Sequence, residues 1–127
     1  MAPLFLDLER VLRIHVALID RYGGEEGVRD LGLLYSAIAA PQASFEGTTA
    51  HQDLFEMAAA YLYHIVQNHP FVDGNKRTGA AAAIIFLAMN GVDLEGDEEG
   101  VAELTLAVAR GEVGKPETTD FFRGLAR

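Results

Sequence analysis

The sequence predicts an all-α protein, a compact bundle of about six helices in which an active-site loop precedes a central buried helix. Apolar residues recur at steps of three and four in several segments, the spacing of one helix face. No alternating pattern longer than a few residues indicates a strand. Half of the 127 residues are hydrophobic and 23% are charged, which is enough apolar surface for a core. We expect a single domain over residues 1–127, because about 100–200 residues form one core.

Aspartate caps and apolar stripes predict the first two helices. Asp7 is a suitable N-cap for a helix that ends at Gly23. Its apolar stripe consists of Leu8, Val11, Leu12, Leu18, Ile19 and Tyr22. Asp30 can cap a short second helix, which must end near Ala40 because a proline disfavours helical geometry in the residue before it. We expect residues 41–50 to form a loop.

Two longer helices flank a short loop in the middle of the chain. From about Asp53 the apolar positions step by three and four as far as Asn68, so His69 lies just past a helix end. Residues 70–74 are predicted to be a loop. The segment from about 75 to 90 is rich in Ala, Ile, Leu and Met. A helix that is apolar on nearly every side is buried, so this segment predicts the central helix.

Two further helices are expected in the last third of the chain. The first runs from Asp97 to about Arg110 and carries the apolar residues Val101, Leu104 and Val108. The second is short and runs from about Thr118 to Ala126.

The composition argues against several classes of protein. Ten Lys and Arg against 19 Asp and Glu give a formal net charge of −9, whereas direct nucleic-acid binding relies on clustered Lys and Arg. Disulfides, thiol nucleophiles and Cys-based metal sites are excluded, since the chain has no cysteine. No apolar run approaches the roughly 20 residues of a membrane span. No signal peptide is evident, so we expect a cytoplasmic protein without a membrane partner.

The candidate site is the stretch from His69 to Thr78. A helix N-terminus presents unpaired N–H groups and the positive end of the helix dipole, so anions bind there. Four residues suited to phosphate binding stand at the predicted start, namely Gly74, Asn75, Lys76 and Arg77. Just before them, Asp73 can hold a divalent cation that bridges phosphate oxygens. A histidine at position 69 can take a proton from a hydroxyl near neutral pH. The pattern indicates phosphoryl or nucleotidyl transfer.

This stretch resembles the signature of the Fic/Doc family, H-x-F-x-[DE]-[AG]-N-[GK]-R, at every specified position from His69 to Arg77. The family more usually has glycine at the position of Lys76. With lysine there, the stretch resembles the Doc (death-on-curing) toxin branch. Doc-like residues also stand at Arg21–Gly24, Asp53–Glu56 and Asn90–Val92. By resemblance, the fold is a small helical one, in agreement with the periodicity.

The resemblance implies a role for each residue of the loop. His69 matches the catalytic base, Phe71 the residue that packs the loop against the core, and Asp73 the Mg²⁺ ligand. The nucleotide-phosphate binders correspond to Asn75, Lys76 and Arg77, of which the two cations stabilise charge on the phosphates. The implied cofactors are therefore ATP and Mg²⁺.

The residue after the motif asparagine bears on which part of ATP is transferred. Fic enzymes that transfer AMP have Gly there and a second Arg, whereas this chain has Lys76 and Ala80. Doc toxins bind ATP in the reversed sense and transfer its γ-phosphate to a threonine of elongation factor Tu. The resemblance thus implies a toxin that phosphorylates a Thr or Ser hydroxyl of a translation factor and so inhibits translation. AMP transfer to a protein hydroxyl and a catalytically silent protein-binding module are the alternatives.

The family also implies a regulatory partner. Many Fic enzymes carry an inhibitory helix of pattern [ST]-x-x-x-[ED]-[GN], and the nearest match here, from Thr49, has Leu54 where Gly or Asn belongs. The resemblance therefore implies an antitoxin protein that binds in trans, with a segment folded into a groove. Of the other histidines, His15 is expected to be a partly buried, hydrogen-bonded residue. A zinc pair of His64 and His69 is not expected, because a spacing of five places them on different helix faces.

Overall fold

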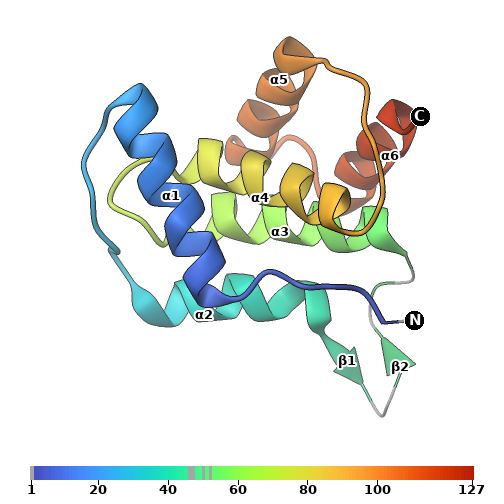
Figure 1. Cartoon of the computed structure of the whole chain (residues 1–127), viewed down its shortest axis with the longest axis horizontal. Coiled ribbons are helices and arrows are strands. Elements are labelled where there is room, and N and C mark those ends of the chain that lie inside the picture. The colour runs from blue at the N-terminus through green and yellow to red at the C-terminus, as the bar shows by residue number, and fades with distance from the viewer. Residues whose placement is uncertain (1, 46–47, 50, 52) are drawn as a thin grey trace.

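The computed structural model describes residues 2–45, 48–49, 51 and 53–127. It is an all-α bundle, as predicted (Figure 1). Its helices are α1 (Leu8–Tyr22), α2 (Leu31–Ala39), α3 (Leu54–Asn68), α4 (Asn75–Met89), α5 (Glu98–Ala109) and α6 (Lys115–Leu125). Among the described residues, no helix combines the length and the apolar character needed to cross a membrane.

Helix α3 lies in the middle of the bundle. It contacts α2, α4, α5 and α6, whereas α1 packs across α4 (Figure 1). The largest fully buried side chains come from several elements, and they include Leu6, Leu34, Tyr61, Leu62, Ile65, Phe71, Phe86, Leu87 and Phe122. Because Phe71 belongs to the loop between α3 and α4, that loop is anchored in this core.

Aspartate side chains start four of the six helices. In α1, α2, α3 and α5 the cap carboxylate accepts a hydrogen bond of 2.9 Å from the backbone N–H three residues later. The caps are Asp7, Asp30, Asp53 and Asp97. Such a bond satisfies an otherwise unpaired donor of the first turn. These helix starts are confirmed.

Two segments differ from the prediction in their secondary structure. Residues 41–50 are not all loop, because a 3₁₀ turn (Ala40–Gln42) and an antiparallel pair of two-residue strands, β1 (Ser44–Phe45) and β2 (Thr48–Thr49), lie there. Positions 46, 47 and 50 of that predicted loop lie outside the described residues.

The second difference is the start of α6, which begins at Lys115 and not near Thr118. The cap of α6 is Gly114. Its N–H donates a 2.7 Å hydrogen bond to the Glu117 carboxylate. Proline is tolerated in a first turn because its missing N–H would be unpaired there. Pro116 therefore belongs to the helix.

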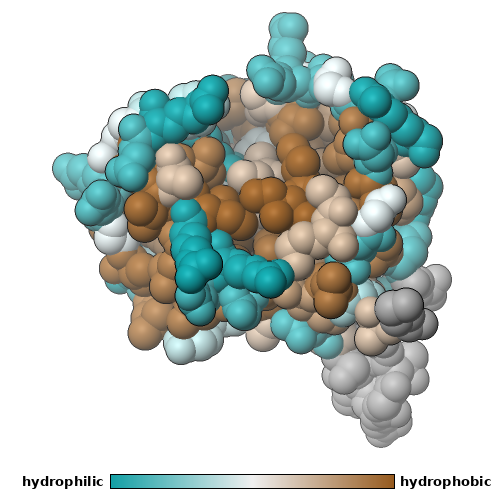
Figure 2. All heavy atoms as spheres, in the orientation of Figure 1, coloured by the Kyte–Doolittle hydropathy of each residue, from teal (hydrophilic) through white to brown (hydrophobic). Residues whose placement is uncertain are grey.

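Helix α4 is buried against α3 but not on every side. Ile84 and Ile85 are 36% and 38% exposed, and Val16 of α1 and Leu106 of α5, two helices that pack against α4, are exposed as well. Figure 2 shows apolar surface over α4 between α1 and α5, where the molecule is hollowed. We call Val16, Ile84, Ile85 and Leu106 the apolar face.

Candidate functional site

The candidate loop begins at His69, which ends α3. His69 has left-handed backbone angles of φ 50° and ψ 53°, and its N–H donates to the carbonyl of Ile65 at 3.3 Å. Among the described residues other than glycine, no other has a positive φ. The residue is exposed, so a substrate can reach it. Positive φ in a histidine is uncommon and has an energetic cost that the surroundings must offset.

A buried asparagine closes the loop. The Asn75 side chain accepts a 2.9 Å hydrogen bond from the N–H of Phe71 and donates a 3.0 Å bond to its carbonyl. Asn75 is 4% exposed and Phe71 is fully buried. Since the amide is engaged in both directions, Asn75 offers an anion its backbone N–H rather than its side chain.

A buried histidine of α1 supports the loop from the side of the core. The His15 ring stacks on Phe71 with centroids 3.8 Å apart and an interplanar angle of 5°. Its Nε2 lies 2.8 Å from the carbonyl oxygen of Asp73. Because a carbonyl can only accept, Nε2 carries the proton. The expected burial and hydrogen bonding of His15 are confirmed, and its contact with the candidate site is new.

The Asp73 carboxylate is exposed and held by two backbone donors. Its Oδ2 accepts from the N–H of Glu25 at 3.2 Å, and its Oδ1 accepts from the N–H of Gly74 at 2.9 Å. The hydrogen bond from Glu25, then that from Gly74, and to a smaller extent Lys76 and Arg77 hold the pKa of Asp73 below its usual range. The group is therefore an anion at neutral pH, with lone pairs left for a cation.

A single carboxylate restricts the kind of metal that fits. Across the described residues, no three His, Asp or Glu side chains gather as a metal cage. Mg²⁺ commonly binds through one or two carboxylates together with waters and substrate phosphates. Asp73 fits that mode, in which waters and a substrate phosphate would supply the remaining oxygens.

The start of α4 is open to an anion. Its cap is Gly74, with φ 79°, and no described side chain caps the first turn. Lys76 and Arg77 are exposed beside it, and the Arg77 guanidinium lies 4.6 Å from the centre of the Tyr22 ring. The structure thus places two cations at a helix N-terminus whose first N–H groups have no capping side chain.

A segment that the sequence did not assign to the site runs beside the loop. We call residues 24–30 the strap. The N–H of Val72 donates to the carbonyl of Gly27 at 3.0 Å, and the N–H groups of Arg29 and Asp30 donate to the carbonyl of Pro70 at 2.7 and 3.0 Å. The one signal in the sequence for the unusual path of the strap was the glycines at positions 23, 24 and 27. In the structure all three have positive φ, which glycine adopts readily.

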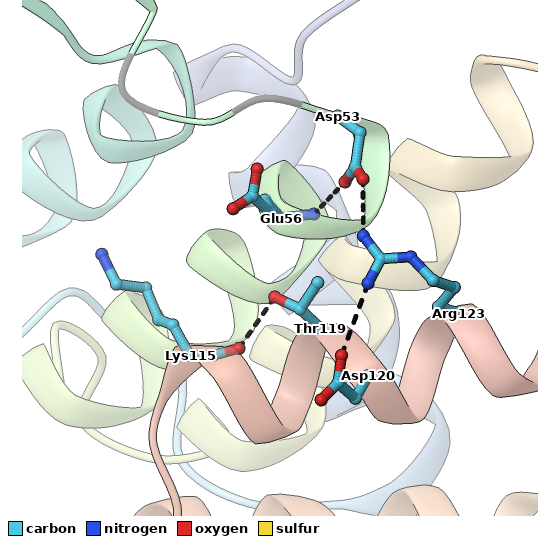
Figure 3. Close-up of polar contacts among 6 residues, drawn as sticks. All are labelled: Asp53, Glu56, Lys115, Thr119, Asp120 and Arg123. Carbon is cyan, nitrogen blue, oxygen red and sulfur yellow. Dashed lines mark hydrogen bonds and ion pairs between the residues drawn. The ribbon is translucent and has the colours of Figure 1, made fainter.

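A cavity of about 550 Å³ lies elsewhere in the molecule, and none of residues 69–77 lines it. Its walls come from α3 and α6 and from the segment that precedes α3. Figure 3 shows one side of it, where Arg123 of α6 binds Asp53, the cap of α3, and also Asp120. The ion pair between Arg123 and Asp53 thus joins α6 to the start of α3.

His64, which lines this cavity, predicts a pH effect on stability. Burial, then the Lys115 ammonium and His51, lower the pKa of His64 to about 4 from 6.5, so the folded state favours the neutral ring. The stabilisation that the folded protein gains from the neutral His64 ring is complete above pH 6.5 and is lost as the pH falls towards 4. With allowance for solvent screening, we expect the free energy of unfolding to fall by about 1–2 kcal/mol more in wild type than in His64→Gln between pH 7 and 4.5.

Denaturant titrations of both proteins at the two pH values measure this difference. Glutamine can still accept the contact that Lys115 makes with Nε2 of His64 at 3.3 Å, but it does not titrate. An equal loss of stability in the two proteins would show that His64 does not carry the effect.

Comparisons with known proteins agree with one another. The sequence model of the Fic/DOC family matches residues 5–87, which include the whole loop. The chain is 50% identical over 93 residues to "Toxin Doc" of Mycolicibacterium smegmatis, covering 73% of this chain and 69% of that protein. It is 39% identical over 119 residues to "Protein kinase doc" of Escherichia phage P1, covering 92% and 91% respectively.

Proposed function

The chain belongs to the Fic/DOC family, and from that premise we propose that it is a Doc-like toxin with protein kinase activity. It transfers the γ-phosphate of ATP to a Thr or Ser hydroxyl of a translation factor in the cytoplasm, with elongation factor Tu as the candidate, and so inhibits translation. The names of the two relatives, a toxin and a protein kinase, support this proposal. The observation that carries it is the loop, which joins an exposed histidine, an ionised carboxylate and a helix start without a capping side chain.

The phosphates of ATP bind at the start of α4. Backbone N–H groups of residues 75–77 donate to phosphate oxygens, and the Lys76 and Arg77 side chains add positive charge. The ring of Tyr22 restrains the Arg77 guanidinium. The side chain of Asn75 acts through the shape of the loop, because both of its polar atoms are bonded to Phe71. Gly74 provides the left-handed φ of 79° with which the chain enters α4, and the side chains of Lys76 and Arg77 are exposed beside it.

His69 acts as the general base. It takes the proton of the target hydroxyl as that oxygen attacks the γ-phosphorus, and the bond from phosphorus to the leaving oxygen of ADP breaks. Lys76 and Arg77 stabilise the charge that spreads over the phosphate oxygens. Asp73 is the residue that would hold Mg²⁺, which supplies further charge neutralisation when bound.

Labelled ATP tests the proposal. The purified protein is incubated with a cell extract, Mg²⁺ and ATP labelled on either the α- or the γ-phosphate, and the protein bands are examined for label. We expect γ-label on a protein of the translation machinery. Transfer of α-label would instead identify an AMP transferase. Transfer of neither label, with no rise in melting temperature on adding Mg-ATP, would identify a silent binding module.

Lys76 is expected to decide between phosphate and AMP transfer. In Lys76→Gly, the space and the lost charge should move activity toward AMP transfer, so the ratio of α-label to γ-label on the target should rise about 10-fold or more. A matched control is Lys115→Ala, which removes the only other lysine of the chain, at the start of α6. That variant should keep the wild-type ratio. An unchanged ratio in Lys76→Gly would show that this residue does not set the orientation of ATP.

The proposed regulator is an antitoxin that binds in trans. The four residues of the apolar face are exposed, and Figure 2 shows apolar surface in a hollow between α1 and α5. Such surfaces commonly mark protein contacts. An amphipathic helix of the antitoxin would bury its apolar side there. When the antitoxin is added, amide hydrogen exchange should slow most around Val16 and Ile84. Protection confined to other parts of the chain would place the contact elsewhere.

A further inference from the structure

The backbone of His69 is held in a conformation that histidine does not favour. Its left-handed angles cost about 1–2 kcal/mol relative to ordinary helical or extended geometry. A helix end of this kind usually has glycine at the left-handed position. Contacts from elsewhere in the chain must therefore keep His69 in place.

Arg29 of the strap makes those contacts. Its Nε donates to the carbonyl oxygen of His69 at 2.7 Å, and its Nη2 donates to that of Asn68 at 3.0 Å. The backbone N–H of the same residue donates to the carbonyl of Pro70 at 2.7 Å. One residue thus holds three successive carbonyls, 68–70, across the end of α3.

The chemistry of arginine suits this position. Its planar guanidinium presents several donors in a fixed fork, which can reach two neighbouring carbonyls at once, whereas a lysine ammonium is a compact charge on a flexible chain. A positive charge at the C-terminal end of a helix also interacts favourably with the helix dipole. The dipole effect alone would stabilise α3 without fixing the angles of His69, so the two roles can be separated.

We propose that Arg29 is a positioning residue, which fixes the backbone of His69 and thereby the place of the catalytic base. The proposal rests on the proposed function, in which His69 is that base. Arg29 acts through His69 and not by touching the phosphates, so its loss should slow the transfer step and leave nucleotide binding intact.

Kinetics of the variants Arg29→Met and Arg29→Lys test the role in transfer. We expect the rate at saturating Mg-ATP to fall about 10- to 100-fold in Arg29→Met, because small displacements of a catalytic group are costly. The Mg-ATP concentration that gives half the maximal rate should stay within about 2-fold. Arg29→Lys keeps the positive charge but loses the forked guanidinium, so its rate should stay close to that of Arg29→Met. Restoration of the full rate by lysine would reduce Arg29 to a charge at a helix end and overturn the proposal.

A matched control and a second measurement separate positioning from folding and from the function itself. Arg13→Met removes an exposed arginine of α1 that pairs with Glu9, and it should keep the wild-type rate. Backbone ¹³C chemical shifts report whether His69 remains left-handed. We expect them to change in Arg29→Met but not in Arg13→Met, at temperatures where both proteins are folded. Unchanged shifts would overturn the proposal. Absence of transfer by the wild type would refute the proposed function, while the shifts would still test the hold of Arg29 on His69.

Discussion

Replacing His69 by alanine should reduce transfer of the γ-phosphate by about 10²- to 10⁴-fold, the contribution typical of a positioned general base. The attacking hydroxyl would then lose its proton only to water. Because His69 is exposed and its side chain is no part of the core, the variant should fold and keep a melting temperature near that of the wild type. Rates of ³²P transfer from labelled ATP, together with circular dichroism melting curves, measure both effects.

A histidine outside the site provides the control for this experiment. His51 lines the cavity between α3 and α6 and none of its neighbours there belongs to the loop. His51→Ala should transfer phosphate at the wild-type rate. If His69→Ala were equally active, the base would have to be another group, and the proposed mechanism would be wrong.

Adding one methyl group at Gly24 should disturb the carboxylate of Asp73, the proposed Mg²⁺ ligand. A Cβ at this position would lie 2.7 Å from Oδ2 of Asp73, closer than real Cβ atoms approach another atom. It would also lie 3.2 Å from Cγ of Asp73 and 3.1 Å from Cδ1 of Ile19, which are tight contacts. The backbone there also has φ +121°, which favours glycine. In Gly24→Ala the carboxylate must therefore move away from the N–H of Glu25. We expect the Mg²⁺ concentration needed for half-maximal ATP binding to rise about 10-fold or more.

The neighbouring glycine separates the clash from backbone strain. Gly23 has φ +86°, and a Cβ there would meet no atom within 4 Å. Both Gly23→Ala and Gly24→Ala should lose about 1–3 kcal/mol of stability from strain, as measured by denaturant titration. Only Gly24→Ala should weaken Mg²⁺-dependent ATP binding, measured by calorimetry over a Mg²⁺ series. The same Mg²⁺ dependence in both variants would show that the contact with Asp73 does not matter.

His69 and Asp73 lie at opposite ends of one loop. His69 is held through its backbone by Arg29, and Asp73 is held through its carboxylate by Glu25 and through its carbonyl by His15. The strap thus reaches both candidate groups, although it contributes no side chain to the family signature. The loop between α3 and α4 depends on this support for its shape, because it contains little regular structure of its own.

The sequence predicted the helices well where the physical signal is local. An aspartate cap accepts a hydrogen bond from a residue three positions later, so the starts of α1, α2, α3 and α5 could be read from short stretches of sequence. The start of α6 was missed because its cap, Gly114, has no side chain that marks a helix start in the sequence. The pairing of β1 and β2 was missed because strands of two residues show no period.

The sequence by itself determined the family, the order of the helices and which residues stand on the candidate loop, since these follow from a nine-residue signature and from spacings within one or two helical turns. Only the tertiary structure decided what holds that loop. The bonds from Arg29 to His69, from Glu25 to Asp73 and from His15 to Asp73 join residues 40, 48 and 58 positions apart. Such contacts arise because α1 packs across α4 and brings the strap beside the loop, and no local pattern encodes that approach.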